Sequence, residues 1–108
     1  MTNAHISNQL AKELLDMVQD HHFERDIELV NGHAGIVPIS VTPELYSLIA
    51  KSIRLQEITR GDFDIFERSG PAGSEQNEVE INPLLLSVYL PHSGIRIDLG
   101  KILTYGQA

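Results

Sequence analysis

The sequence predicts a single α+β domain, in which two helices pack on a small antiparallel sheet with a C-terminal β-hairpin. Residues 5–20 and residues 43–58 repeat apolar side chains at the helical period. Residues 79–99 instead alternate apolar and polar side chains, as strands with one buried face do. The length of 108 residues fits one domain that spans residues 1–108.

The N-terminal third is expected to contain the first helix and an extended segment. The helix over residues 5–20 has one apolar face, made of Ile6, Leu10, Leu14, Met17 and Val18. Residues 24–38 are less regular, and Ile27, Leu29 and Val30 indicate a short strand or extended segment. Asn31-Gly32 indicates a turn, and a β-branched run over residues 36–41 leads into the second helix.

The second helix, over residues 43–58, has the clearest local signals. Thr42 is suited to the N-cap position and Pro43 to the first helical turn, while Glu44 lies near the positive end of the helix dipole. One apolar face follows, made of Leu45, Leu48, Ile49 and Ile53. The helix is expected to stop at Thr59–Gly61, where Gly61 can take the left-handed conformation that closes helices.

The C-terminal third is expected to form the sheet. A polar loop over residues 69–77 precedes an alternating segment around Val79 and Ile81. Residues 84–99 are predicted to form a β-hairpin around the turn Pro91–Gly94, and Gly100 ends its last strand. Residues 101–108 are expected to form a short tail or one helical turn. Because a small sheet leaves open edges, we expect a pairing partner.

The composition excludes several classes of function. Eight basic and fifteen acidic residues give a net charge of −7 without a basic stripe, which argues against nucleic acid and against a membrane surface as partners. No apolar run is long enough to cross a membrane, and the N-terminus lacks the features of a secretory signal, so a cytoplasmic location is expected. Without cysteine, the chain forms no disulfide and offers no thiol chemistry.

The segment Thr59–Ile65 is the best candidate for a functional site. Alternation in an extended segment allows Phe63 to bury its ring while Asp62 and Asp64 point the other way. Asp98, at the end of the last strand, is a third candidate carboxylate. Two interpretations stay open, a ligand-facing loop and a polar exit from the helix, and the residues alone favour the second.

Other chemistry has weaker support in the sequence. The five histidines do not have the spacing of a common metal site. No Gly-x-Ser-x-Gly elbow and no glycine-rich phosphate loop with a lysine occurs.

Three segments of the chain together form a pattern. They are Leu29-Val30-Asn31, the stretch from Val41-Thr42-Pro43-Glu44-Leu45 to Thr59-Arg60-Gly61-Asp62-Phe63-Asp64, and Ile97-Asp98-Leu99-Gly100. In order and spacing, this pattern resembles the N-terminal part of the FAD:protein FMN transferases, the ApbE family. That family shows Leu-Asn, then a helix with Thr-x-Gly-x-Phe-Asp, then a hairpin before Asp-Leu-Gly-Gly. The resemblance covers roughly residues 10–105 and implies part of the ApbE fold.

The resemblance implies a flavin-related site. Members of the family bind FAD, split its pyrophosphate with a divalent metal, usually magnesium, and attach FMN to a Ser or Thr of an acceptor protein, while some hydrolyse FAD. It gives Asp62, Phe63 and Asp64 a candidate role in flavin binding. Asp98 and Gly100 are the candidates near the metal and the phosphates.

Departures from the family pattern change this expectation. Lys101 replaces the second Gly, Thr104 stands at the Lys position, and Gly-Tyr is reversed as Tyr105-Gly106. The metal-binding Asp and Thr belong to the family's C-terminal half, which this sequence lacks, so catalysis by this chain alone is not expected.

The first hypothesis is therefore a non-catalytic ApbE-like domain that forms a homodimer and serves as a protein-interaction or weak flavin-binding module. A second is FMN transferase or FAD hydrolase activity, with magnesium, completed by a partner chain. A third is an unrelated α+β assembly protein.

Overall fold

The computed structural model describes residues 2–68 and 79–106, and its side chains over residues 6–68 and 79–105. The described elements run along the chain in the order α1 (Thr2–Asp20), α2 (Glu24–Gly32), β1 (Ile39–Ser40), α3 (Pro43–Ile58), β2 (Phe66–Arg68), β3 (Glu80–Asn82), β4 (Ser87–Tyr89), β5 (Ile95–Ile97) and α4 (Gly100–Gly106). Four helices and small antiparallel sheets confirm the α+β class. The predicted loop over residues 69–77 lies outside the described residues.

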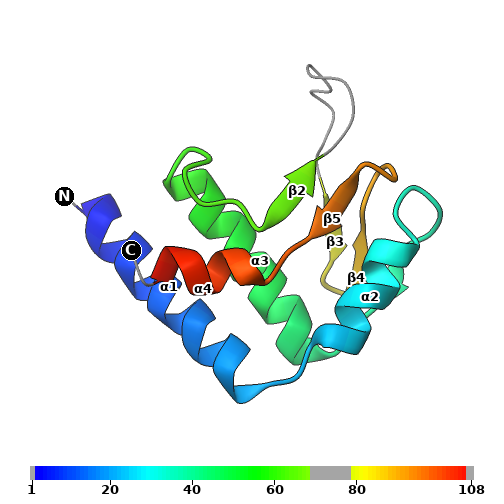
Figure 1. Cartoon of the computed structure of the whole chain (residues 1–108), viewed down its shortest axis with the longest axis horizontal. Coiled ribbons are helices and arrows are strands. Elements are labelled where there is room, and N and C mark those ends of the chain that lie inside the picture. The colour runs from blue at the N-terminus through cyan, green and yellow to red at the C-terminus, as the bar shows by residue number, and fades with distance from the viewer. Residues whose placement is uncertain (1, 69–78, 107–108) are drawn as a thin grey trace.

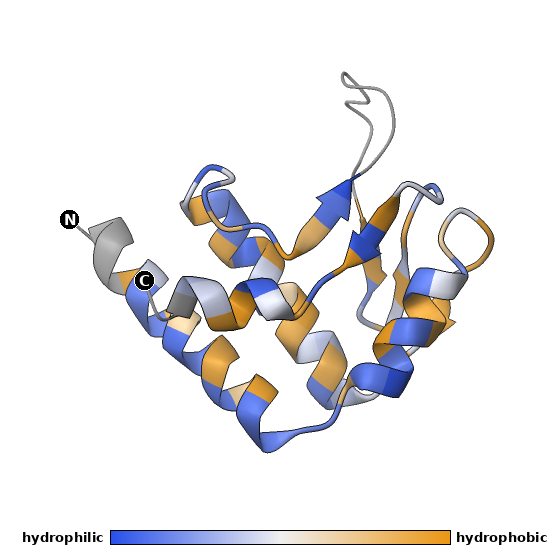
Figure 2. Cartoon of the chain, viewed as in Figure 1, coloured by the Kyte–Doolittle hydropathy of each residue, from blue (hydrophilic) through white to orange (hydrophobic). Residues whose placement is uncertain are grey.

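Helices α1, α3 and α4 pack together on one side of the molecule (Figure 1). The predicted apolar face of α1 is correct, since Leu10 and Leu14 are buried and the other members pack against the core. Figure 2 shows hydrophobic positions on α1 and α3 turned towards each other, with hydrophilic positions outside. Thr42 caps α3 as predicted, because its hydroxyl accepts a hydrogen bond from the Leu45 backbone N–H over 3.2 Å.

The extended segment predicted around residues 27–30 is wrong, because residues 24–32 form helix α2. The buried residues are Phe23, Ile27, Val30 and Ala34, whose spacing of three and four positions is that of a helix face. Glu24 and Asp26 lie in the first turn, where the helix dipole favours negative charge. The β-branched residues suggested a strand, but burial of one helical face against the core outweighs this weak preference.

The hairpin predicted over residues 84–99 is also wrong in its pairing. Strand β4 is the centre of a three-stranded sheet, where it pairs antiparallel with β3 and with β1. Strand β5 pairs antiparallel with β2 in a separate two-stranded ribbon. Because β3 and β1 pair with the two edges of β4, the backbone groups of β4 already have partners, and β5 cannot pair with it.

The hairpin that does form joins β3 to β4 through residues 83–86. The Asn82 side chain accepts hydrogen bonds from the backbone N–H groups of Leu84 and Leu85, and Leu86 has a φ of 50°. This turn places Leu84 and Leu85 outside the core, with 92% and 66% of their surface exposed.

Residues 100–106 form helix α4, which is longer than the predicted single turn. Its Ile102 is buried, and α4 packs against α1 (Figure 1). The helix follows β5 directly, so it carries the residues after Asp98 along the end of the β2–β5 ribbon. None of the helices in the described parts of the chain is long and apolar enough to cross a membrane.

Candidate functional site

The structure brings all five predicted site residues into one open groove with a volume of about 630 Å³. The groove lies between the segment that follows α3 and the segment that begins α4. Its lining residues are Gly61, Asp62, Phe63, Asp64, Glu67, Asp98, Gly100, Lys101, Thr104 and Tyr105. Below, we call it the acidic groove, because four of these side chains are carboxylates and one is a lysine.

The first wall of the groove depends on how α3 ends. The Gly61 N–H donates to the Gln56 carbonyl over 2.9 Å, and the Arg60 N–H donates to the Glu57 carbonyl over 3.2 Å. These two bonds form a Schellman closure, in which Arg60 occupies the left-handed position after the helix. Arg60 has a φ of 55° and Gly61 a φ of 88°, so the turn needs two residues in this region rather than the glycine alone.

Thr59 fixes the chain beyond this closure. Its hydroxyl donates a hydrogen bond to the Leu55 carbonyl over 2.8 Å and accepts one from the Phe63 backbone N–H over 3.0 Å. The same side chain thereby ends the helix and sets where the Phe63 segment leaves it.

Phe63 is part of the core, although it also lines the groove. Only 2% of its surface is exposed, and its ring meets Tyr105 of α4 edge-on, with ring centroids 5.1 Å apart and an interplanar angle of 66°. Phe63 therefore anchors the groove. The aromatic side chain more accessible to a ligand is the part-buried Tyr105.

Asp64 and Asp98 hold the turns on either side of the β2–β5 ribbon. Asp64 accepts a hydrogen bond from the Phe66 backbone N–H over 2.9 Å and forms an ion pair with Arg68. Asp98 accepts one from the Gly100 N–H over 2.9 Å, while its own N–H donates to the Ile65 carbonyl over 2.8 Å. Both carboxylates therefore already have hydrogen-bonding partners that stabilise the turns.

Gly100 is positioned by the hydrogen bond from its N–H to the Asp98 carboxylate. A Cβ atom at this position would lie 3.1 Å from the Asp98 carboxylate oxygen, which is closer than most side-chain carbons approach. Glycine thus allows the Asp98 carboxylate to reach the backbone at the start of α4.

Asp62 differs from the other two aspartates. Its backbone N–H donates to the Thr59 carbonyl over 3.1 Å, but its exposed carboxylate forms no hydrogen bond or ion pair with any residue that the structure describes. Glu67 is also exposed, whereas the Lys101 ammonium donates a hydrogen bond to the Phe66 carbonyl over 3.1 Å. Asp62 and Glu67 are consequently the carboxylates most available to a ligand.

Sequence reasoning missed Asn31 as a structural residue. Its side-chain oxygen accepts from the Ile97 N–H over 2.7 Å, and its side-chain nitrogen donates to the Ile97 carbonyl over 3.1 Å. The amide satisfies both backbone groups of Ile97 on the edge of β5 away from β2, so it acts as a neighbouring strand would. The sequence signals at this position are the Asn-Gly pair, which suggested a turn, and the Leu29-Val30-Asn31 part of the family pattern, and neither suggested this contact.

Among the residues with described side chains, no three His, Asp or Glu side chains come together in a way that could hold a metal ion. No protein-family model matches the chain, and no curated protein matches it.

Proposed function

We propose that this chain is a non-catalytic binding module whose acidic groove recognises a positively charged segment of a partner protein. The observation that carries the proposal is the distribution of charge along the groove. Asp62, Glu67, Asp64 and Asp98 line it, and Lys101 is the only basic residue among its lining residues. Such a surface attracts Lys and Arg side chains and repels anions.

The assignment as non-catalytic rests on what the carboxylates already do. Asp64 and Asp98 each accept a backbone hydrogen bond, and Asp64 is also paired with Arg68. A general acid or base must reach a proton on its substrate. Here those two carboxylates support turns, while Asp62 and Glu67 stand at the rim as surface charges.

The direct test is binding of a fluorescent peptide of alternating Lys and Gly, compared with a matched Glu and Gly peptide. We expect the lysine peptide to bind and the glutamate peptide not to bind. The double change Asp62→Asn with Glu67→Gln should weaken binding about threefold to tenfold, as expected for losing exposed ion pairs. Glu24→Gln with Glu28→Gln, two exposed residues of α2, is the matched control and should leave the affinity unchanged. Equal binding of both peptides would contradict the proposal.

A second candidate function is weak flavin binding, in keeping with the resemblance to the ApbE family. It is favoured by one observation, that the residues assigned by the resemblance line a single groove although they come from two distant segments. The charge of the groove opposes the pyrophosphate of FAD, so we expect riboflavin to bind better than FAD. Tyr105, rather than the buried Phe63, is the aromatic residue that would contact the ring.

Titration of riboflavin, FMN and FAD, followed by flavin fluorescence, tests this candidate. Tyr105→Leu is a better probe than Phe63→Ala, because the latter removes a core side chain. Absence of binding at about millimolar flavin would leave about 4 kcal/mol or less of affinity and remove this candidate. Release of FMN from FAD with magnesium would instead favour an enzyme, with or without a partner chain to complete it. If neither peptide nor flavin binds, an unrelated α+β assembly role is the better hypothesis.

We also expect the chain to form a homodimer, because its small sheets keep open edges.

A further inference from the structure

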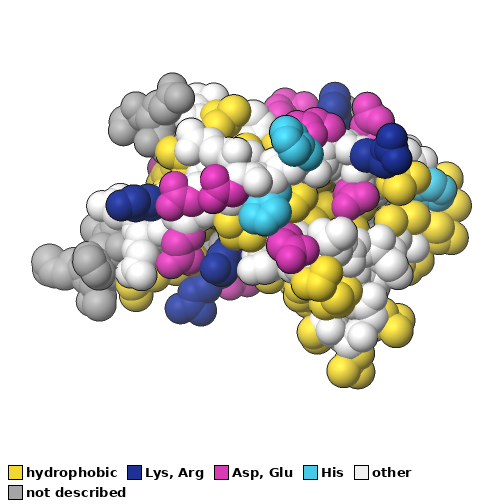
Figure 3. Space-filling view, turned by 90° about the horizontal axis from the view of Figure 1, so that it is seen from below, with side chains coloured by type: hydrophobic (Ala, Val, Ile, Leu, Met, Phe, Trp, Pro, Cys, Tyr) yellow, Lys and Arg dark blue, Asp and Glu magenta, His cyan; other side chains and the backbone are white. Residues whose placement is uncertain are grey.

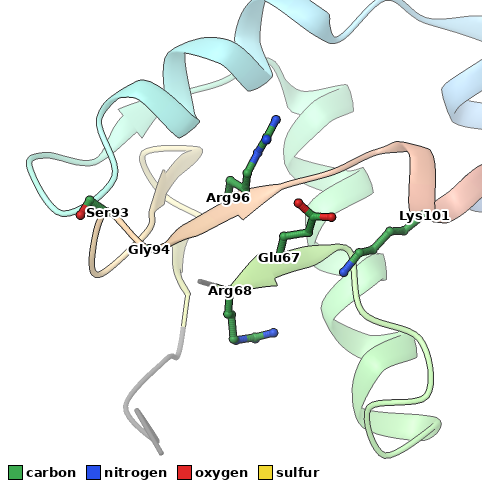
Figure 4. A pocket seen from close by; sticks show the side chains of 6 residues that line it. All are labelled: Glu67, Arg68, Ser93, Gly94, Arg96 and Lys101. Carbon is green, nitrogen blue, oxygen red and sulfur yellow. The ribbon is translucent and has the colours of Figure 1, made fainter. Parts of the chain in front are cut away.

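A second pocket adjoins the acidic groove on the β2–β5 ribbon. It has a volume of about 320 Å³ and is lined by Glu67, Arg68, Ser93, Gly94, Arg96 and Lys101 (Figure 4). We call it the basic pocket, because it contains three of the eight Lys and Arg residues of a chain whose net charge is −7. Glu67 and Lys101 line both the acidic groove and the basic pocket, so the two form one continuous surface.

The charges of this surface are only partly neutralised within the chain. Arg68 is paired with Asp64, and Lys101 donates to the Phe66 carbonyl. Arg96 is exposed and forms no ion pair with any described residue, as is also true of Asp62. Glu67 and Arg96 are opposite each other in the antiparallel register, and their side chains extend from the same side of the ribbon, whereas Arg68 extends from the other side (Figure 4). Phe66 and Ile97 are buried.

A partner with charge of one sign fits only half of this surface. A uniformly basic segment would be attracted to the acidic groove and repelled by Arg96, which has no ion-pair partner among the described residues. A uniformly acidic segment would be attracted to Arg96 and repelled by Asp62 and Glu67. A partner that carries both signs in the reverse order places opposite charges against both halves of this surface. Any other order places like charges together and is disfavoured.

A second copy of the same chain, turned by a two-fold axis, has that reversed order. We propose that the β2–β5 ribbon is an interface between two copies, with the basic pocket of each facing the acidic groove of the other. The shared residues Glu67 and Lys101 then lie closest to the axis, because an isologous interface uses the same surface on both subunits. This inference rests on the proposed function, in that it names the partner of the acidic groove.

The surface also determines what kind of dimer to expect. Charged side chains make up four of the six residues that line the basic pocket and five of the ten that line the acidic groove. Ion pairs rather than apolar burial would therefore provide the attraction. The space-filling view shows that acidic and basic side chains intermingle elsewhere too, while hydrophobic side chains gather at the end of the molecule occupied by α2 and the sheet (Figure 3). We therefore expect a dimer that dissociates as salt is raised, because salt screens exposed charges.

Sedimentation of the full chain with charge-reversal variants tests the inference. We expect the unmodified chain to dimerise at low salt and at concentrations of about 100 µM, and Asp62→Lys and Arg96→Glu each to weaken dimerisation by about tenfold or more, because each places like charges together. Mixing these two variants should restore a dimer that contains one copy of each, because Lys at position 62 then faces Glu at position 96. Glu24→Lys and Arg25→Glu on α2 form the matched control pair, which should dimerise alone as the unmodified chain does.

Far-ultraviolet circular dichroism checks that each variant is folded, and Asp62→Asn and Arg96→Gln replace any variant that is not. A monomeric unmodified chain, or a mixture that associates no better than its two components, would overturn the interface. If that monomer still binds the lysine peptide, the proposed role of the acidic groove stands and only the second copy is excluded. If it binds no peptide, both proposals fail.

Discussion

The two sides of the β2–β5 ribbon differ in how their side chains are used. On the inner side, Phe66, Ile95 and Ile97 are buried, Phe63 packs beside them, and Asn31 holds the edge of β5 through two hydrogen bonds. On the outer side, Glu67 and Arg96 are exposed, and the Asp62 carboxylate lies nearby without a partner among the described residues. The inner side therefore determines the fold, whereas the outer side has charges that remain available for binding.

The difference between the two sides changes which of the predicted site residues are expected to bind a ligand. Phe63, Asp64, Asp98 and Gly100 each have a structural task that accounts for them. Asp62 has none, and Arg96, which no motif in the sequence suggested, has none either. Substitutions on the two sides should consequently separate stability from binding.

Phe63→Ala should have the largest effect, because it removes a ring from the inner side. We expect the free energy of unfolding to fall by about 3–5 kcal/mol, the range for large-to-small changes at buried aromatic positions. Chemical denaturation measures this change, and Phe63→Leu, which keeps most of the volume, should cost clearly less. A loss below about 1 kcal/mol for Phe63→Ala would mean that the ring is not part of the core.

Asn31→Asp should have the next largest effect, because it keeps the shape of the side chain but places a carboxylate oxygen against the Ile97 carbonyl. We expect the free energy of unfolding to fall by about 2–3 kcal/mol. The hydrogen bond to the Ile97 carbonyl is replaced by repulsion, and this buried carbonyl is left without a donor. Hydrogen exchange of the Ile97 amide should also become faster.

Asn8→Asp is the control for this change, because it makes the same replacement at an exposed position on α1. It should leave stability almost unchanged. Equal effects of the two variants would show that the hydrogen bonds between Asn31 and Ile97 do not contribute to the stability of the chain.

Gly61→Ala should have an intermediate effect at the point where α3 ends. No neighbouring atom would contact an added Cβ, so the cost comes from the φ of 88° alone. We expect a loss of about 1–2 kcal/mol in thermal or chemical unfolding. Arg60→Gly, one position earlier, should stabilise the chain slightly or leave it unchanged, because glycine adopts its φ of 55° without strain. The distinguishing result is a loss of stability for Gly61→Ala and no loss for Arg60→Gly.

Asp62→Asn and Arg96→Gln on the outer side should have the smallest effect on stability. We expect each to change the free energy of unfolding by less than about 0.5 kcal/mol, as is usual for exposed positions. The same variants should alter peptide binding or self-association. A large loss of stability would show that these charges support the fold, and the distinction between the two sides of the ribbon would then be wrong.

The sequence by itself determined the elements whose signals are local. Helices α1 and α3 were predictable because their apolar period, the Thr42 cap and Pro43 act within a few residues of one another. The burial of Phe63 was also foreseeable, from the alternation of side chains along an extended segment.

Only the tertiary structure decided which partners these elements take. Residues 24–32 become a helix because one of their faces is buried, and β4 pairs with β3 and β1 rather than with β5. Asn31 reaches Ile97 across 66 positions of sequence, and the roles of Asp64 and Asp98 depend on backbone groups that the folded chain presents to them. The physical reason is that each buried polar group must find a hydrogen-bonding partner, and packing of distant segments decides which partner is within reach.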